Sequence, residues 1–350
     1  MSLGGGGLAA PDVPALAAAV AAGTRRALAQ AITIVESQRT DHRAAADLLL
    51  GLLMPRTGGA LRIGISGAPG VGKSTFIEAF GQFLIARGHR PAVLAVDPSS
   101  PLTGGSILGD KTRMETLSRD PRAFIRPSPA GTTLGGVARR TREASLLCEA
   151  AGFDVVVVET VGVGQSETAV AEMVDLFLLL LPPGGGDDLQ GIKKGIVELA
   201  DIVLVNKADG DLAAAAQRAA ADYRAAIGLL RPARADWVPP VLLVSARERS
   251  GIDAVWTEIA RFRDTLGVSR IAERRARQAV AWMWREIETA LRTALAADPR
   301  AAPMLPGLEA GVAAGRLSPV AAARQVLAAF LDREAEARQS GAPAAAGPQA

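Results

Sequence analysis

The 350-residue sequence contains one cysteine, two histidines and few aromatic side chains, which make up 4% of the chain. A single cysteine, Cys148, cannot form an intramolecular disulfide, which is typical of a reducing compartment. So few aromatic rings exclude base stacking as a main means of binding. The formal net charge is only +3, which indicates no concentrated basic face. We therefore expect no nucleic-acid partner.

Long apolar runs are also missing. Runs such as Leu176–Pro183 are far too short to span a bilayer. The first residues lack the basic and apolar regions of a secretory signal. Hydrophobic residues make up 49% and charged residues 21% of the chain, which is the composition of a globular protein. We therefore predict a cytoplasmic protein with no membrane contact.

Short apolar segments recur along the middle of the chain and are separated by helical stretches. The segments are Leu61–Ile65, Ala92–Val96, Val155–Val158, Leu176–Leu181, Ile202–Val205 and Val241–Val244. Continuous apolar runs of this length are typical of strands buried on both faces. Strands that alternate with helices predict an α/β fold with a doubly wound, mostly parallel sheet. Such a sheet binds ligands at the carboxyl ends of its strands.

Helical patterns flank this sheet at both ends of the chain. We predict an N-terminal helical extension over residues 1–56, the α/β domain over 57–268, a C-terminal helical arm over 269–338 and a disordered tail over 339–350. Cys148 is expected to lie in the core. The arginines at 139, 140, 274, 275 and 277 are interpreted as parts of solvated helix faces.

The first predicted strand is followed by a phosphate-binding motif, G-x-x-x-x-G-K-[ST]. It consists of Gly67, Ala68, Pro69, Gly70, Val71, Gly72, Lys73 and Ser74. The glycines let successive backbone N–H groups face a phosphate, and the positive end of the following helix adds to the attraction. Lys73 is expected to reach the β- and γ-phosphates, Ser74 to bind Mg²⁺ and Thr75 to meet the α-phosphate.

Two further strands end in carboxylates, which makes them candidate partners of the metal. Val155–Val158 is followed by Glu159 and, three residues later, by Gly162. Glu159 can reach Mg²⁺ through a bound water, and Gly162 can offer its backbone N–H to the γ-phosphate. Asp97, which follows another strand, is a second metal candidate. Its alternative role is to cap a turn.

The strand Ile202–Val205 ends in an N-K-x-D pattern that distinguishes guanine from adenine. Asp209 can accept hydrogen bonds from both guanine N1–H and the 2-amino group, whereas adenine would leave this acceptor unpaired. Asn206 can bond the base edge and brace the loop, and the Lys207 stem can lie over the ring. After a later strand, the backbone amides of Ser245, Ala246 and Arg247 can meet guanine O6. The sequence therefore predicts a P-loop enzyme that hydrolyses GTP to GDP and phosphate.

With these motifs in place, the chain resembles the MeaB/ArgK-type GTPases, the family of the methylmalonic aciduria type A protein. The resemblance extends from about Asp41 to Trp284. Its most distinctive segments begin at Val96 (VDPSS), Gly104 (GGSILGDKTRM), Arg126 (RPSP), Glu159 (ETVGVGQSET) and Asp188 (DLQGIKKG).

The resemblance implies a G-protein chaperone of adenosylcobalamin-dependent methylmalonyl-CoA mutase, or of a related acyl-CoA mutase. Such proteins gate cofactor loading, protection and reactivation, and the mutase stimulates their low intrinsic GTPase activity. The resemblance further implies a homodimer joined through the C-terminal arm, Mg²⁺ as cofactor and no cobalamin bound by this chain itself. It also implies two switch segments. Asp110 is a candidate for positioning the attacking water. Gln190 and Lys193 are candidates for completing the catalytic site when the partner binds, with Lys194 as the alternative to Lys193.

Three other functions fit the sequence less well. A GTPase that inserts a soft metal needs thiolate or imidazole ligands, but the chain offers only Cys148, His42 and His89. A protein-targeting GTPase needs a methionine-rich groove, whereas this chain has six scattered methionines. An ATPase that energises amino-acid transport is disfavoured by Asp209, because ATP has no donor pair for its carboxylate.

Overall fold

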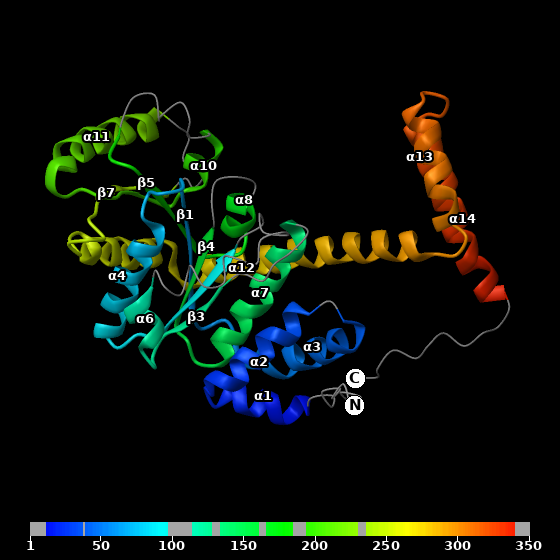
Figure 1. The fold of residues 1–350 in the computed structure, drawn as a ribbon, viewed down its shortest axis with the longest axis horizontal. Coiled ribbons are helices and arrows are strands. Elements are labelled where there is room, and N and C mark those ends of the chain that lie inside the picture. The colour runs from blue at the N-terminus through cyan, green and yellow to red at the C-terminus, as the bar shows by residue number, and fades with distance from the viewer. Residues whose placement is uncertain are drawn as a thin grey trace, which may run out of the picture. The chain divides into compact units, whose positions relative to one another are not determined.

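The chain forms a seven-stranded parallel sheet covered by helices on both faces (Figure 1). The computed structural model describes residues 12–37, 39–96, 114–127, 134–160, 166–184, 194–229 and 236–339. In chain order, the strands are β1 (Leu61–Gly67), β2 (Pro91–Val96), β3 (Phe124–Arg126), β4 (Val155–Thr160), β5 (Leu176–Leu181), β6 (Ile202–Val205) and β7 (Val241–Leu243). They lie in the order β3-β2-β4-β1-β5-β6-β7. The predicted α/β fold class is confirmed.

Continuous apolar runs form the strands because both faces of the sheet are buried. Every residue of β2, β4, β5 and β6 is buried. Parallel pairing sets Ile65 of β1 beside Glu159 of β4 and Gly67 beside Leu180 of β5. This register places the ends of β1 and β4 side by side, where the sequence changes from apolar to polar.

Alternate strand residues point into different layers of helices. One face is covered by α7 (Leu134–Ala150), α8 (Ser166–Ala171), α10 (Lys194–Leu199) and α11 (Ala213–Leu229). The other face is covered by α4 (Lys73–Ala86), α6 (Glu115–Arg119) and the first turns of α12 (Ile252–Ala297). Gly64 of β1 leaves room for the side chains of Phe177 on β5 and Val170 on α8. A Cβ at position 64 would lie 2.8 Å from Phe177 and 3.0 Å from Val170.

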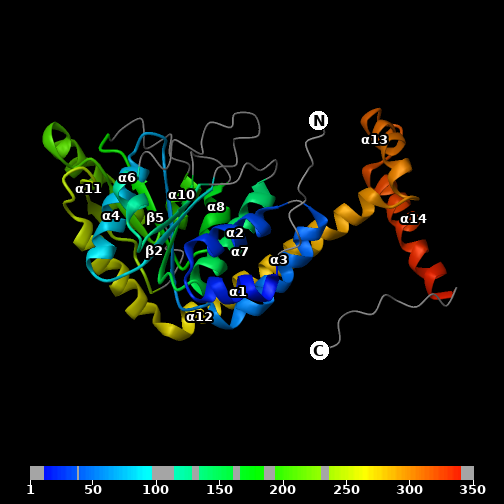
Figure 2. The same ribbon diagram turned by 60° about the horizontal axis from the view of Figure 1, so that its bottom comes forward.

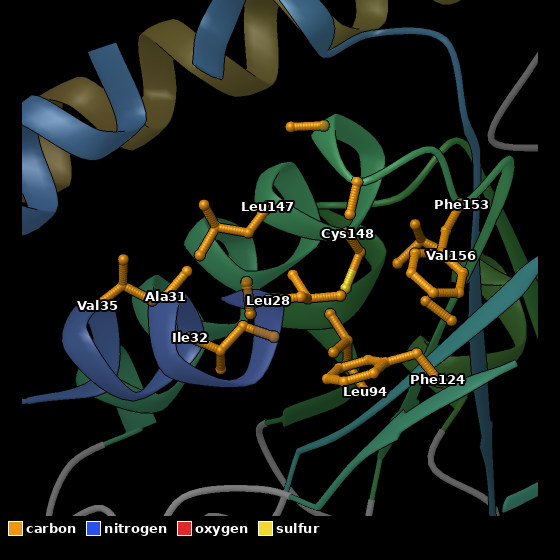
Figure 3. Close-up of a cluster of buried hydrophobic side chains, with 14 of the residues drawn as sticks. Leu28, Ala31, Ile32, Val35, Leu94, Phe124, Leu147, Cys148, Phe153 and Val156 are labelled. Atoms are coloured by element: carbon orange, nitrogen blue, oxygen red, sulfur yellow. The ribbon is translucent and has the colours of Figure 1, made fainter. Parts of the chain in front are cut away.

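The N-terminal extension forms three helices: α1 (Val13–Ala21), α2 (Arg25–Glu36) and α3 (Thr40–Leu53). α2 and α3 pack against α7 on the outside of the sheet (Figure 2). Leu28, Ile32 and Leu147 belong to one apolar core with the sheet residues Leu94 and Val156 (Figure 3). These side chains anchor the extension to the α/β domain.

Cys148 lies in the same core and is completely buried (Figure 3). Burial raises the pKa of its thiol well above the usual range, so the sulfur is a neutral, unreactive group. Its predicted position in the core is confirmed.

The last part of the chain is helical. α12 contains a break at Gly267, whose φ is 70°. It is followed by the short helix η3 (Ala302–Met304), by α13 (Leu305–Ala313) and by α14 (Pro319–Gln339). The described residues up to Arg275 form one compact unit and those from Ala276 a second. In the part of the chain that the structure describes, no helix is both long and apolar enough to cross a membrane.

All six predicted strands are present, and helix α12 ends at Ala297, just before Asp298-Pro299. The strand β3 and helix α13 were not predicted. β3 has only three residues, which is too short for a periodic pattern to stand out from its surroundings.

Candidate functional site

The residues of the candidate site follow the carboxyl ends of four strands, at one end of the sheet. β1 leads into the loop Ala68–Gly72, β4 ends with Glu159 and Thr160, β6 is followed by Asn206, and β7 by Val244 and Ser245. In a parallel sheet, this end is the place where ligands bind.

The loop after β1 requires glycine at positions where a side chain would collide. Gly67 has a φ of +155°, and a Cβ there would lie 2.3 Å from the Leu180 carbonyl oxygen. Gly72, which precedes α4, has a φ of +94°, and a Cβ there would lie 2.7 Å from Asn206 Nδ2. This backbone turns directly into the N-terminus of α4, where free N–H groups attract anions.

Lys73 opens α4, and its ammonium is held within the loop. Its Nζ donates to the carbonyl oxygens of Gly67 at 2.7 Å and Ala68 at 3.3 Å. The side chain is only 8% exposed. A cation among backbone N–H groups at a helix N-terminus forms a binding site for a polyphosphate.

Ser74 and Glu159 meet beside this loop. Ser74 Oγ donates to Glu159 Oε1 at 3.2 Å, and Glu159 is buried at the end of β4. A hydroxyl and a carboxylate at this separation fit Mg²⁺, which takes oxygen ligands and keeps several waters. No group of three or more His, Cys, Asp or Glu that could hold a metal is found within the described ranges.

Asn206 connects the phosphate loop to the other half of the site. Its Nδ2 donates to the Val71 carbonyl oxygen at 2.9 Å, and its Oδ1 accepts from the Ala246 N–H at 3.2 Å. The residue is 1% exposed. One buried amide therefore fixes the P-loop against the loops after β6 and β7.

The residues after Asn206 turn toward solvent. Lys207 has a φ of 60°, which is unusual for a residue with a side chain, and it is exposed. Asp209 is half-buried. The left-handed backbone at Lys207 ends the extended run of β6. Lys207 Cε would lie 4.0 Å from a Cβ on Gly72, which places Lys207 beside the P-loop.

The loop after β7 is held by reciprocal backbone hydrogen bonds. Ser245 and Ser250 each donate a backbone N–H to the other's carbonyl oxygen at 3.1 Å. The Ser245 hydroxyl accepts from the Glu248 N–H at 3.0 Å. Ala246 is buried beside Asn206, whereas Arg247 is exposed. The structure therefore brings the predicted Ser245–Arg247 segment together with Asn206.

The remaining predicted site residues form two groups. Pro69, Gly70 and Thr75 belong to the P-loop and the first turn of α4, and Thr75 is exposed. The other five are Asp97, Asp110, Gly162, Gln190 and Lys193, all of which lie outside the described residues.

Sequence reasoning missed one pair at the site. Thr160 Oγ1 donates to Ser66 Oγ at 2.8 Å, and both residues are buried. The bond ties the last residue of β4 to the end of β1. Ser66 precedes the predicted Gly67, and Thr160 follows the predicted Glu159. The pairing of β1 with β4 at their carboxyl ends is the signal that could have identified this pair.

Comparison with known proteins gives consistent matches. A family described as "Methylmalonyl Co-A mutase-associated GTPase MeaB" matches residues 28–300. The Escherichia coli "GTPase ArgK" is 54% identical over 267 residues, covering 76% of this chain and 81% of that protein. The Mus musculus "Methylmalonic aciduria type A homolog, mitochondrial" is 49% identical over 322 residues, covering 89% of this chain and 78% of that protein.

A solved structure described as "LAO/AO transport system kinase" covers 95% of this chain and 100% of its own, with a TM-score of 0.73 and 40% identity. Its fold therefore matches that of this chain over nearly the whole length.

Proposed function

The chain belongs to the family of methylmalonyl-CoA mutase-associated GTPases MeaB and is a GTPase; we propose that it is the Mg²⁺-dependent G-protein chaperone of an adenosylcobalamin-dependent mutase. The single observation that supports nucleotide binding in this proposal is the hydrogen bond of the Asn206 amide to Val71. It joins a P-loop to the loop that holds Asp209, so that phosphates and base are bound by one connected site.

Within this site each residue has a separate task. The backbone of Gly67–Gly72 and the Lys73 ammonium bind the β- and γ-phosphates. Ser74 binds Mg²⁺ directly, and Glu159 holds it directly or through water. Thr75 meets the α-phosphate. Mg²⁺ neutralises charge that develops on the phosphates. The distance of 3.2 Å between Ser74 and Glu159 supports this division.

The guanine base is bound on the side of Asn206 that faces away from the phosphates. Asp209 accepts from guanine N1–H and the 2-amino group, the Lys207 stem lies over the ring, and the backbone at Ser245–Arg247 meets O6. A Cβ at Gly72 would lie 4.0 Å from Lys207 Cε. That proximity supports a nucleotide that runs from the base loop to the P-loop.

Residues outside the described ranges complete the proposed cycle. Gly162 offers its N–H to the γ-phosphate, Asp97 serves as a second metal-side carboxylate and Asp110 positions the attacking water. Lys193 supplies positive charge late in the reaction, when the partner binds, and Gln190 holds that arrangement. Phosphoryl transfer is stabilised by such added cations.

The proposed partner is methylmalonyl-CoA mutase or a related acyl-CoA mutase. The chaperone gates cofactor loading, protection and reactivation, while the cobalamin itself stays on the mutase. The family's description and the name of the mouse relative support the mutase as partner. We also propose that the protein acts in the cytoplasm.

We further propose a homodimer formed through the C-terminal unit. Large apolar side chains are exposed there: Val280, Met283, Trp284, Ile287, Leu291, Val320, Leu327 and Leu331. Exposed apolar residues in such number support a protein interface.

The experiment combines complex formation with turnover. Purified chain and methylmalonyl-CoA mutase are run on gel filtration in GDP and in a non-hydrolysable GTP analogue, and GTP hydrolysis is measured with and without the mutase. We expect a complex and a higher rate of hydrolysis. No complex in either nucleotide, with no change in rate, would contradict the chaperone role.

Lys193→Ala, with Lys194→Ala as its matched control, separates catalysis from docking. Lys193→Ala is expected to keep basal hydrolysis and complex formation but to lose most of the stimulation. Full stimulation in Lys193→Ala would rule out its catalytic role, and loss of the complex would make it an interface residue.

A further inference from the structure

The sheet has an unpaired edge at β3. This strand is last in the order and pairs with β2 alone, through Phe124, Ile125 and Arg126. Among the described residues, no backbone hydrogen bond is made from its outer side. A parallel strand pairs half of its N–H and C=O groups with each neighbour, so the outer groups of β3 have no backbone partner within the described ranges.

A cavity of about 410 Å³ lies along this edge. α2, α6 and β3 form its walls, with the lining residues Arg25, Arg26, Ala29, Ser118, Phe124, Ile125, Arg126 and Pro127. Phe124 packs into the core on one face of the sheet and Ile125 into the core on the other. A cavity that touches both residues therefore opens onto the edge of the strand rather than onto one face.

The cavity is positively charged. Three arginines line it, and no carboxylate of a described residue does. Arg126 is neutralised by an ion pair with Glu36. Among the described residues, Arg25 donates to the backbone oxygen of Asp120, at 3.1 Å. A hydrogen bond from Arg122, together with the charge of Arg25, lowers the pKa of the Asp120 carboxyl. Arg26 is exposed and has no ion pair in the described part of the chain. The nearby carboxylates Glu115 and Asp120 are already paired with other arginines. The Arg26 charge therefore remains uncompensated at the groove, whereas that of Arg25 is partly offset by Asp120.

We propose that this groove, the β3 edge groove, binds an extended acidic segment of a partner protein, which pairs with β3 as an added strand. The edge supplies backbone donors and acceptors, and Arg25 and Arg26 supply charge complementary to acidic side chains. β3 has three residues, so the paired stretch is about 10 Å long at the rise of a strand.

The same observations disfavour other occupants. A small anion would use the arginines but leave the strand edge unpaired. A second copy of the chain, joined edge to edge, would bring Arg25 and Arg26 against the same residues of its partner, and like charges at such an interface oppose association.

The test uses the full-length protein and a fluorescent peptide that alternates valine and glutamate over eight residues, with binding measured by anisotropy. Two matched peptides separate the contributions. One replaces glutamate with lysine, and the other is N-methylated on alternate backbone nitrogens along one edge. We expect both changes to weaken binding at least about tenfold.

The protein variant is Arg26→Glu, with Arg218→Glu on α11 as the control, because Arg218 is also an exposed helix arginine. Arg26→Glu should weaken the acidic peptide at least about tenfold, and the control should leave its affinity unchanged. Slower hydrogen exchange at residues 124–126 on peptide addition is the direct sign of strand pairing.

Three results would overturn the proposal. The N-methylated peptide binds as tightly as the parent, tripolyphosphate competes with the peptide at equal concentration, or Arg26→Glu and Arg218→Glu weaken binding equally. The first two would identify a site for small anions, and the third a nonspecific attraction of charge.

Discussion

The side-chain amide of Asn206 donates a hydrogen bond to the carbonyl oxygen of Val71 at 2.9 Å, although the two residues are 135 positions apart in the sequence. The same amide accepts from the Ala246 N–H. It therefore satisfies two backbone groups in two different loops, and neither group has another bond to replace it in the described part of the chain.

Asn206→Ala is expected to lower the free energy of unfolding by about 1–3 kcal/mol, because it leaves buried polar groups unpaired. It should also weaken GDP and GTP to a similar extent, since both depend on the position of the P-loop. Thermal unfolding and titration with a fluorescent GDP analogue measure the two effects. Gln217→Ala, at an exposed position of α11, is the control. Normal nucleotide affinity in Asn206→Ala would show that the P-loop holds its shape without this amide.

The base site gives a prediction of specificity. Asp209→Asn should weaken GDP at least about a hundredfold and gain affinity for xanthosine diphosphate. The amide can donate where xanthine presents a carbonyl. Asp211→Asn, two residues along and exposed, should change neither affinity. Competition between the two nucleotides measures both. If Asp209→Asn bound GDP as tightly as the unchanged protein, Asp209 would not be the group that reads the base.

Much of this site was predictable, because its residues lie together in the sequence. The P-loop and the segment Asn206–Asp209 each follow a continuous apolar run, so their strands and their place at the sheet edge could be predicted together. The hydrogen bond from Asn206 to Val71 could not be predicted in the same way. A pattern gives the residue types at each loop, but the distance between the loops depends on the order of the strands.

The interpretation of the arginines as solvated was wrong in three of the five cases. Arg139 pairs with buried Glu143, Arg275 with buried Asp175, and Arg274 lies 4.0 Å from Asp201. Helical spacing shows where each Cα lies on the helix but not where a long side chain ends. Arg274 and Arg275 reach carboxylates that stand far away in sequence, so these partners could not be identified from one helix alone. Glu143 is different, because it lies four residues after Arg139 on α7.

Ser74 and Thr75 carry neighbouring hydroxyls with different proposed roles, so their substitutions should affect Mg²⁺ binding differently. Ser74→Ala should raise the Mg²⁺ concentration needed for half-maximal GTP binding about tenfold or more, because a direct ligand is lost. Glu159→Gln should act in the same direction. Thr75→Ala should weaken GTP but leave this Mg²⁺ midpoint unchanged, since Thr75 is assigned to the α-phosphate. GTP binding at a series of Mg²⁺ concentrations distinguishes them. Equal midpoints in Ser74→Ala and the unchanged protein would remove Ser74 from the metal site.

Arg275 lies near the amino-terminal ends of β1 and β5, where it gives a prediction of protein stability. Its Nε and Nη2 donate to the two carboxylate oxygens of Asp175 at 2.7 and 2.5 Å. It also donates to the backbone oxygens of Gly58 and Ala60. Asp175 is buried and accepts in addition from the Arg62 N–H at 2.9 Å. The guanidinium therefore holds α12 to the chain before β1 and to the start of β5.

Arg275→Met should lower the free energy of unfolding by about 3 kcal/mol, because it leaves a buried carboxylate with fewer partners. In a unit of this size, that loss corresponds to a fall in melting temperature of roughly 6–12 °C. Arg277→Met, two residues along the same helix and exposed, should change the melting temperature little. The double variant Asp175→Leu/Arg275→Met should be less destabilised than the sum of the two single changes, since it removes both charges together. Additive losses, or equal losses in Arg275→Met and Arg277→Met, would mean that α12 is held by its apolar contacts and not by this ion pair.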